Sequence, residues 1–417
     1  MKYAVVAATA GGCRQALNIC CVLEYGRDEA HTSIENSRDI AWDMQGRVDI
    51  YVHSKAAADI EKMMAEEASV HRKCKEYQRL GDLLPQLWQE YEGLIFIMAA
   101  GIVVRLIAPH IVSKLCDPAI LVIDDRGENI ISLLSGHMGG ANRLTTYLAR
   151  GLGANPVITT ATDVNNLLAP DVVAGYIKAV PCPKENIVRF NAGILRGENI
   201  CWWLSEDLPD CHGYEKILKA RGIAYSRLPT QDIEDAGRQE EQTIGERNTG
   251  DCSSTGRMLR NLPWSIGGLH VVIAEKSEKL PQQENILYLY PRKLIAGVGC
   301  RRGTEKESIL SALSLATRTI GWDKSRISGL ASTVAKSDER GLLAAAEELG
   351  VSIEFYENEG LAEMIEKYHL PESAFVKKII GVGNICQASA LCRAGQGNIA
   401  LEKTKYEKVT VALVWQK

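Results

Sequence analysis

The chain alternates short apolar runs with stretches in which apolar residues recur at helical spacing. Five early runs have the length and composition of β-strands, and they span residues 3–8, 48–52, 93–100, 120–124 and 130–134. The run at 93–100 contains no polar side chain, as is typical of a strand buried on both faces of a parallel sheet. Helices are expected over residues 14–25, over 60–77 and after Asn142. This alternation predicts an α/β fold with largely parallel sheets.

The second half of the chain continues the alternation after a break in composition. Residues 229–263 hold few apolar side chains, which predicts a polar, flexible insertion. A last set of elements opens with the strand LIAGVGC, followed by a helix with a capping box at Thr304–Glu307, a helix capped by Asp338 and a closing hairpin. We therefore expect three α/β domains, at residues 1–125, 126–290 and 291–417.

Composition and charge narrow the classes of function. The chain has 417 residues, 46% of them hydrophobic and 24% charged, so that sizeable cores can form. A net charge of −4 and an aromatic content of 6% give no reason to expect a nucleic-acid partner. The longest apolar stretch, Leu94–Ile107, is interrupted by Gly101 and Arg105 and is too short to span a membrane. A cytoplasmic protein is expected.

None of the 12 cysteines forms a C-x-x-C pair. Scattered cysteines on apolar elements are mostly core residues in a reducing compartment. The sequence therefore predicts no metal site.

The loop at Ser135–Asn142, SGHMGGAN, is the first candidate for chemistry. Glycines between a buried strand and a helix N-terminus can present backbone N–H groups to an anion, here Gly136, Gly139 and Gly140. His137 could act there as a general acid or base near neutral pH. A tight turn whose histidine bonds its own loop explains the same residues.

Two further candidates are arginines. Arg301 and Arg302 follow a glycine run whose spacing, G-x-G-x-x-x-G, differs from the dinucleotide fingerprint. Guanidinium groups favour carboxylate recognition, although two solvated arginines before a helix are the alternative. Arg105 lies in an apolar segment and needs a partner, either an internal aspartate or a substrate carboxylate.

Polar residues also end two predicted strands. Asp124 and Asp125 end one strand, where α/β sites gather, although a hairpin turn is the favoured interpretation of the two residues. Thr160 and Asp163, in ITTATD, end another strand and could contribute to the same crevice.

Four strings together resemble a known family: IFIMAAGIVVRLIAPH, LLSGHMGGANRLTTYLA, PVITTATDVNN and LIAGVGCRRGT. The chain resembles the cobalt-precorrin-5A hydrolases, often labelled cobalamin biosynthesis protein G, over nearly its whole length. Residues 26–46 and 231–257 depart from the family pattern.

The resemblance implies a step of anaerobic vitamin B12 synthesis on a cobalt-bound tetrapyrrole. The δ-lactone of cobalt-precorrin-5A is opened and the extruded meso carbon leaves as acetaldehyde, giving cobalt-precorrin-5B. No cofactor is expected, since the cobalt arrives with the substrate, and neighbouring pathway enzymes are candidate partners.

On this basis His137 is the expected base and Asp125 the expected second proton donor or acceptor. The expected substrate-binding residues are Arg105, Ser135, Gly136, Gly139, Gly140, Asn142, Thr160, Asp163, Arg301 and Arg302. Two other classes stay open: a tetrapyrrole carrier without catalysis, and a nucleotide-dependent oxidoreductase that uses the GVGCRRG loop.

Overall fold

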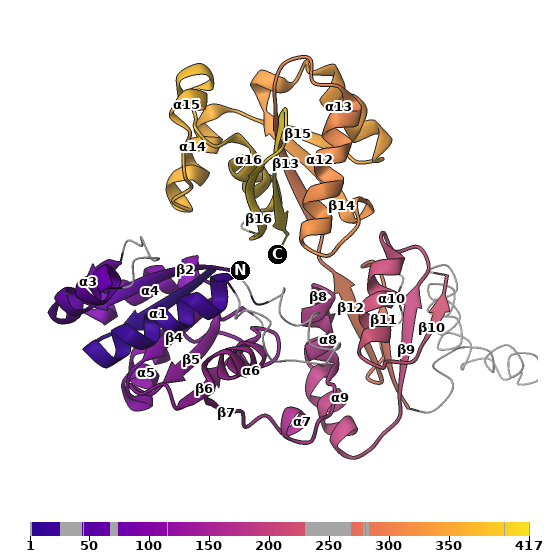
Figure 1. Cartoon of the computed structure of the whole chain (residues 1–417). Coiled ribbons are helices and arrows are strands. Elements are labelled where there is room, and N and C mark those ends of the chain that lie inside the picture. The colour runs from indigo at the N-terminus through magenta and orange to yellow at the C-terminus, as the bar shows by residue number, and fades with distance from the viewer. Residues whose placement is uncertain are drawn as a thin grey trace, which may run out of the picture. The chain divides into compact units, whose positions relative to one another are not determined.

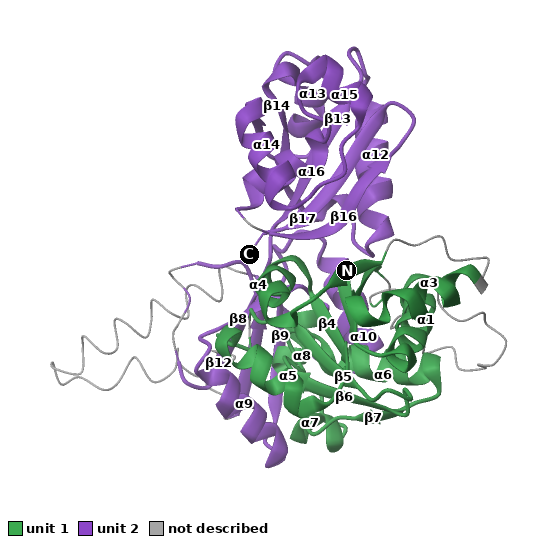
Figure 2. Cartoon of the chain, turned by 90° about the vertical axis from the view of Figure 1, so that its left-hand side faces the viewer, with its two compact units in different colours: residues 1–175 green, residues 176–417 purple. Residues whose placement is uncertain are grey.

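The computed structural model describes residues 2–25, 44, 46–66, 74–114, 116–229, 268–277, 280, 283–395 and 397–416. The chain divides into two compact units, residues 1–175 and 176–417 (Figure 2). The predicted insertion, from residue 230 onward, lies outside the described residues, as does nearly all of 26–46.

Unit 1 is built on a seven-stranded sheet with the order β3-β2-β1-β4-β5-β6-β7 (Figure 1). The strands are β1 (Lys2–Ala7), β2 (Arg47–His53), β3 (Lys75–Tyr77), β4 (Gly93–Ile97), β5 (Ala119–Ile123), β6 (Asn129–Leu134) and β7 (Asn155–Val157). Strands β1 to β5 are parallel, β6 runs antiparallel to β5, and β7 is parallel to β6. The chain runs outward from β1 to β2 and β3 and then returns to place β4 on the other side of β1. The strand order therefore reverses between β1 and β4, where α/β sheets open a crevice at their carboxyl edge.

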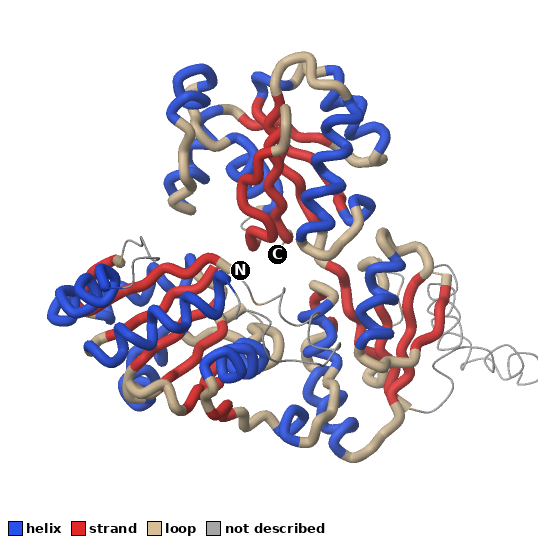
Figure 3. Tube along the Cα trace, viewed as in Figure 1, coloured by secondary structure: helices blue, strands red, loops and turns tan. Residues whose placement is uncertain are grey.

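Helices cover both faces of this sheet (Figure 3). Apolar side chains of α1 (Ala10–Tyr25), α3 (Ala57–Glu66) and α6 (Ala141–Leu152) share one core with one face of the strands. Those of α4 (Leu80–Glu90) and α5 (Ala100–Ile107) share a second core with the other face. All five residues of β4 are buried, as the unbroken apolar run predicted.

The strand pairing differs from the predicted domain boundary at residue 125. That boundary falls in the turn of the β5–β6 hairpin, so it would divide one sheet. Composition does not change at this turn because β6 and α6 complete the same two cores, and β7 pairs with β6. Unit 1 ends with two short helices, α7 (Ala161–Val164) and α8 (Pro170–Tyr176).

Unit 2 contains two five-stranded sheets. The first has the order β10-β9-β11-β12-β8, and its elements are β8 (Ala179–Cys182), α9 (Asn186–Leu195), β9 (Ile200–Ser205), α10 (Cys211–Ala220), β10 (Tyr225–Leu228), β11 (Leu269–Ile273) and β12 (Ile286–Pro291). The second has the order β15-β14-β13-β17-β16. Its elements are β13 (Leu294–Cys300), α12 (Lys306–Thr319), β14 (Ile327–Thr333), α13 (Arg340–Glu348), β15 (Ile353–Tyr356), α14 (Asn358–Lys367), α15 (Ala374–Ile380), α16 (Ile385–Ala394), β16 (Asn398–Lys405) and β17 (Val409–Trp415). The chain also forms short 3-10 turns, of which η6 (Lys324–Arg326) precedes β14.

The predicted fold class is confirmed: the sheets are mostly parallel, and β16 and β17 form the expected closing hairpin. The helix predicted over 60–77 is wrong at its end, because Lys75–Tyr77 pairs with β2 as an edge strand. The predicted capping box at Thr304 is also wrong, since the Thr304 hydroxyl donates to the carbonyl of Arg301 instead. None of the helices in the described residues is long and apolar enough to cross a membrane.

Candidate active site

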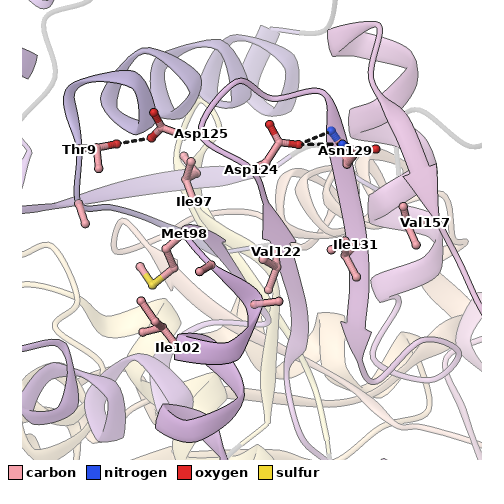
Figure 4. A pocket seen from close by; sticks show the side chains of 13 residues that line it. Thr9, Ile97, Met98, Ile102, Val122, Asp124, Asp125, Asn129, Ile131 and Val157 are labelled. Atoms are coloured by element: carbon pink, nitrogen blue, oxygen red, sulfur yellow. Dashed lines mark hydrogen bonds between the residues drawn. The ribbon is translucent and has the colours of Figure 1, made fainter.

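A cavity of about 670 Å³ opens at the carboxyl edge of the unit 1 sheet, where β1, β4 and β5 end (Figure 4). Its floor is apolar and comes from strand ends and from α5: Ile97, Met98, Ile102, Val122, Ile131 and Val157. Its polar lining residues are Thr9, Asp124, Asp125 and Asn129. An apolar floor with a few polar groups, at the point where the strand order reverses, is the usual form of a ligand site in α/β proteins. We call this cavity the carboxyl-edge crevice.

Asp125 lies over the first turn of α1. The Thr9 hydroxyl donates a hydrogen bond to its carboxylate (Figure 4), and Thr9 Oγ1 also accepts the amide of Gly12. A Cβ atom on Gly11 would lie 2.3 Å from Asp125 Oδ2, so only glycine allows the carboxylate to approach this closely. The first amides of a helix have no partner within the helix, and they carry a partial positive charge. Sequence and fold thus place a carboxylate, a hydroxyl and a helix N-terminus at one point of the crevice.

Asp124 has a different role from Asp125. Its carboxylate accepts the backbone amides of Arg126, Glu128 and Asn129, which close the β5–β6 hairpin. Burial raises the pKa of Asp124, but these hydrogen bonds together outweigh it and hold the pKa below its ordinary value. The hairpin-turn interpretation of Asp124 therefore fits, while Asp125 is directed to the crevice.

His137 is held on both ring nitrogens. Nδ1 lies 3.0 Å from Asp171 Oδ2, and Nε2 lies 2.8 Å from Asp163 Oδ2 and 3.1 Å from the Thr162 hydroxyl. Asp171 is only 2% exposed and opens α8, which leads out of unit 1. Burial lowers the pKa of His137, but the hydrogen bonds and charges of Asp163 and Asp171 outweigh it and raise the pKa to about 9. The ring is therefore an imidazolium at neutral pH, which has no lone pair with which to act as a base.

The backbone amides of the loop around His137 donate to carbonyls of the same loop. The amide of Gly140 donates to the His137 carbonyl, that of Ala141 to the Ser135 carbonyl and that of Asn142 to the Gly136 carbonyl. A Cβ atom on Gly139 would lie 2.4 Å from Ser135 Cβ, so this glycine is needed for the turn itself. Ser135 adopts a left-handed backbone with φ 59°, and its buried hydroxyl has no hydrogen-bond partner among the residues that the structure describes. The glycines thus close a tight turn, one of the two interpretations open from the sequence.

Asn142 was expected to cap α6 and to bind substrate, and the structure gives it another place. Gly140 is the N-cap residue of α6, and Asn142 is 4% exposed. Its amide group donates to the Thr160 hydroxyl and to Asp163, and its oxygen accepts the Ser132 hydroxyl. Asn142, Thr160, Asp163 and His137 therefore form one network, which ties the β6–α6 loop to α7.

The His137 network and Asp125 lie at opposite ends of the strands β5 and β6. Leu134, which leads to the loop, pairs with Ile120 at the start of β5, whereas Asp125 follows the end of β5. Five residue steps separate Ile120 from Asp125, which corresponds to about 16 Å in extended chain. The two residues expected to take part in the catalysis therefore lie towards opposite ends of β5. The cause is the antiparallel direction of β6, which the hairpin-turn interpretation of Asp124 and Asp125 implies.

Comparisons with known proteins give the family. The model for the cobalamin synthesis G N-terminal domain matches residues 82–163, and the model for the cobalamin synthesis G C-terminus matches residues 294–414. The chain is 33% identical over 333 residues to the cobalt-precorrin-5A hydrolase of Salmonella typhimurium, covering 79% of this chain and 83% of the relative. The chain belongs to the cobalamin synthesis G family. The resemblance stated from the sequence is confirmed.

This chain is also similar to a second relative and to a solved structure. The cobalt-precorrin-5A hydrolase of Priestia megaterium is 30% identical, over 79% of this chain and 80% of its own length. The crystal structure described as a cobalamin biosynthesis protein G homolog from Sulfolobus solfataricus covers 100% of this chain and 97% of its own, with a TM-score of 0.47 and 17% identity.

The arginines expected to bind substrate are distributed over both units of this cobalamin synthesis G chain. Arg105 is exposed on α5, where it donates to the carbonyl of Gly101, 2.8 Å away, and no aspartate of the described residues pairs with it. Arg302 forms an exposed ion pair with Asp338 in unit 2, and Arg301 is also exposed there. Only Arg105 shares a unit with the carboxyl-edge crevice.

The glycine run before Arg301 is not a phosphate loop. Gly297 and Gly299 lie inside β13, and a Cβ atom on Gly297 would lie 1.7 Å from the carbonyl oxygen of Cys386. This glycine therefore allows α16 to pack against the sheet. The geometry gives no support to the nucleotide-binding interpretation.

Two residues with contacts in these sites, Thr9 and Asp171, were not predicted from the sequence. The signal for Thr9 is the string ATAGG, which follows the first strand at once, as ligand loops of α/β folds do. Asp171 had no comparable signal, because it lies 34 residues after His137. Within the described residues, no group of three or more His, Cys, Asp or Glu side chains has the arrangement of a metal site.

Proposed function

We propose that the chain hydrolyses cobalt-precorrin-5A at the carboxyl-edge crevice, opening the δ-lactone and releasing acetaldehyde to give cobalt-precorrin-5B. Membership of the cobalamin synthesis G family supports a role in cobalamin biosynthesis, and two relatives are named as hydrolases of this substrate. The observation that carries the proposal is the position of Asp125 beside Thr9 and the first turn of α1, above an apolar floor. Cobalt is part of the substrate.

The first step is lactone opening. Asp125 takes a proton from water, and the resulting hydroxide adds to the lactone carbonyl carbon. Negative charge then develops on the carbonyl oxygen, which the amides of Ala10 and Gly11 and the dipole of α1 stabilise. The C–O bond of the lactone breaks, and the proton held by Asp125 passes to the departing oxygen. The products of this step are a carboxylic acid and an alcohol on the extruded carbon.

The second step is cleavage of the bond between the extruded carbon and the macrocycle. The alcohol loses its proton to Asp125, the C–O bond becomes a carbonyl, and the electron pair of the breaking C–C bond passes into the conjugated ring. A proton returns to the ring, and acetaldehyde leaves. One carboxylate can serve both steps because each step returns its proton.

His137 does not enter this proposal as the base. Its ring is charged at neutral pH and enclosed by two carboxylates. We assign it a positioning role, in which it fixes the segment from α7 to α8 against the end of β6. Ser135, Gly136, Gly139, Gly140, Asn142, Thr160 and Asp163 belong to the same supporting structure.

Arg105 is the proposed contact for a substrate carboxylate. It follows Ile102 of the crevice floor by three residues, so the two side chains share one face of α5. Replacing it in Arg105→Gln is expected to raise KM about tenfold, because an exposed charged hydrogen bond contributes about 1.4 kcal/mol, with kcat little changed. Steady-state kinetics with Arg150→Gln, an exposed arginine of α6, as control measure this. An unchanged KM would remove Arg105 from the site.

Thr9 is the proposed positioning residue for Asp125. In Thr9→Val the side chain keeps its shape but loses the hydroxyl that donates to the carboxylate, so kcat is expected to fall about tenfold at unchanged KM. Thr9→Ser keeps the hydroxyl and is expected to restore most of kcat. Equal loss in both variants would show that Thr9 acts through packing alone.

The reaction itself is tested by anaerobic incubation of the purified chain with cobalt-precorrin-5A. Acetaldehyde is measured together with the mass of the tetrapyrrole. Release of one acetaldehyde per macrocycle, with the matching loss of mass, is expected. Tight binding without acetaldehyde would make the chain a tetrapyrrole carrier and would contradict the proposal.

A further inference from the structure

The turn that carries Asp125 lies against one face of α1. This turn connects β5 to β6. Gly11 and Gln15 are four residues apart in α1, so they lie on the same face of the helix. Gly11 lies against the Asp125 carboxylate, and Gln15 lies against Gly127 of the same turn. The helix therefore contacts the turn at two successive levels, first at the carboxylate and then at the backbone that follows it.

The Gln15 side chain holds the backbone of this turn. Its Nε2 donates to the carbonyl of Arg126, 2.8 Å away, and its Oε1 accepts Nδ2 of Asn18, 3.2 Å away. Because Asn18 occupies the oxygen, the NH₂ of the Gln15 amide is directed to the turn. Gly127 has a φ of +73°, and a Cβ atom there would lie 2.7 Å from Gln15 Oε1. Glycine at this position thus allows the turn to approach the amide.

The bond from Gln15 matters because the turn has few other links to this helix. Among the described residues, the other hydrogen bond that joins them comes from Thr9, before α1, to the Asp125 carboxylate itself. The side chains of Arg126 and Glu128 are 84% and 65% exposed and pair with each other. Asp125 gains and loses a proton in the proposed reaction, which changes its bond to Thr9. The bond from Gln15 to a backbone carbonyl does not involve the carboxylate and can persist through the reaction.

We propose that Gln15 is a second positioning residue for Asp125. Through the Arg126 carbonyl it fixes the backbone from which the carboxylate reaches the carboxyl-edge crevice, and Asn18 orients its amide. Gln15 is not one of the crevice lining residues, so it acts through Asp125 and not on the substrate. This inference rests on the proposed function of the crevice.

The first test replaces Gln15 by methionine. Gln15→Met keeps the length and the helix propensity of the side chain but removes both polar groups. The value of kcat for acetaldehyde release is expected to fall about fivefold at unchanged KM, the effect of one lost hydrogen bond on the position of the base. Gln86→Met is the matched control and is expected to keep the wild-type kcat. Gln86 is an exposed glutamine of α4 that donates to Glu90, outside the crevice lining.

A double variant separates a positioning role from a general effect on the fold. If Gln15 acts through Asp125, then Asp125→Asn combined with Gln15→Met keeps the kcat of Asp125→Asn alone to within about twofold. Losses that multiply in the double variant would overturn the proposal. Hydrogen exchange of peptides that cover residues 124–129 gives a readout that does not depend on activity. Exchange is expected to be faster in Gln15→Met and unchanged in Gln86→Met, and equal exchange in both would also overturn the proposal.

The outcomes distinguish this inference from the proposed function. Wild-type kcat in Gln15→Met, together with a large loss in Asp125→Asn, would overturn the role of Gln15 and leave the proposed function standing. Wild-type kcat in Asp125→Asn would contradict the proposed function and, with it, the role of Gln15 in the reaction.

Discussion

Asp125→Asn is expected to lower kcat for acetaldehyde release by a factor of about 10² to 10⁴, the usual contribution of a general base. The amide keeps the size of the side chain and can still accept the Thr9 hydroxyl, so the crevice should keep its form. Because Asp125 is proposed to transfer protons and not to hold the macrocycle, substrate affinity should stay within about threefold, which corresponds to under 1 kcal/mol. Steady-state assays of acetaldehyde and a binding titration measure the two quantities.

Asp82→Asn provides the control for this variant. Asp82 is an exposed carboxylate in the first turn of α4, outside the crevice lining. Its replacement is expected to leave kcat unchanged. Equal activity of Asp125→Asn and Asp82→Asn would remove Asp125 from the chemistry.

His137→Gln is expected to destabilise unit 1 by about 3 kcal/mol near pH 6.5, since a buried charge pair loses its cation. Glutamine cannot neutralise Asp163 and Asp171, and Asp171 is almost fully buried. The loss is measured as a free energy of unfolding in denaturant, and hydrogen exchange of peptides from residues 135–176 localises it. His212→Gln, at a side chain that is 90% exposed, is the control.

The pH dependence of this loss has a definite sign. The pKa of His137 is raised from 6.5 to about 9 in the folded chain, so protonation stabilises the fold. That contribution is fully present below pH 6.5 and is lost as pH rises through 9. The stability difference between the wild type and His137→Gln should therefore shrink from pH 6.5 to pH 9.5. A difference that grows over this range would mean that His137 is neutral in the fold.

The elements were largely predictable because their signals are local. Burial of β4 is visible in the apolar run at 93–100, and burial of one face of α6 is visible in the helical spacing of Leu144 and Leu148. Both signals lie within a few residues of the chain. The fold class and family followed from such signals together with four motif strings.

The candidate site was less predictable because its contacts are distant in sequence. Thr9 meets Asp125 across 116 residues, and His137 meets Asp171 across 34. A hairpin turn at Asp124 and Asp125 implies that β6 runs antiparallel to β5 and that the loop after β6 lies at the far end of β5, but the sequence did not decide between this turn and a ligand site. Asn142 and Asp338 were expected to cap helices, but each side chain has a partner distant in sequence instead. Asn142 donates to Asp163, and Asp338 pairs with Arg302.

The most direct test of the carboxyl-edge crevice as the catalytic site compares Asp125→Asn and His137→Gln in single turnover. Each variant, folded and in excess over cobalt-precorrin-5A, is mixed anaerobically at pH 7 and quenched for acetaldehyde. We predict that Asp125→Asn binds the substrate but releases acetaldehyde at least 100-fold more slowly, a loss typical of a missing general base, while His137→Gln keeps a rate within about tenfold of the wild type. The reverse order, with Asp125→Asn active and His137→Gln bound but inactive, would contradict the account and place the chemistry at the His137 loop.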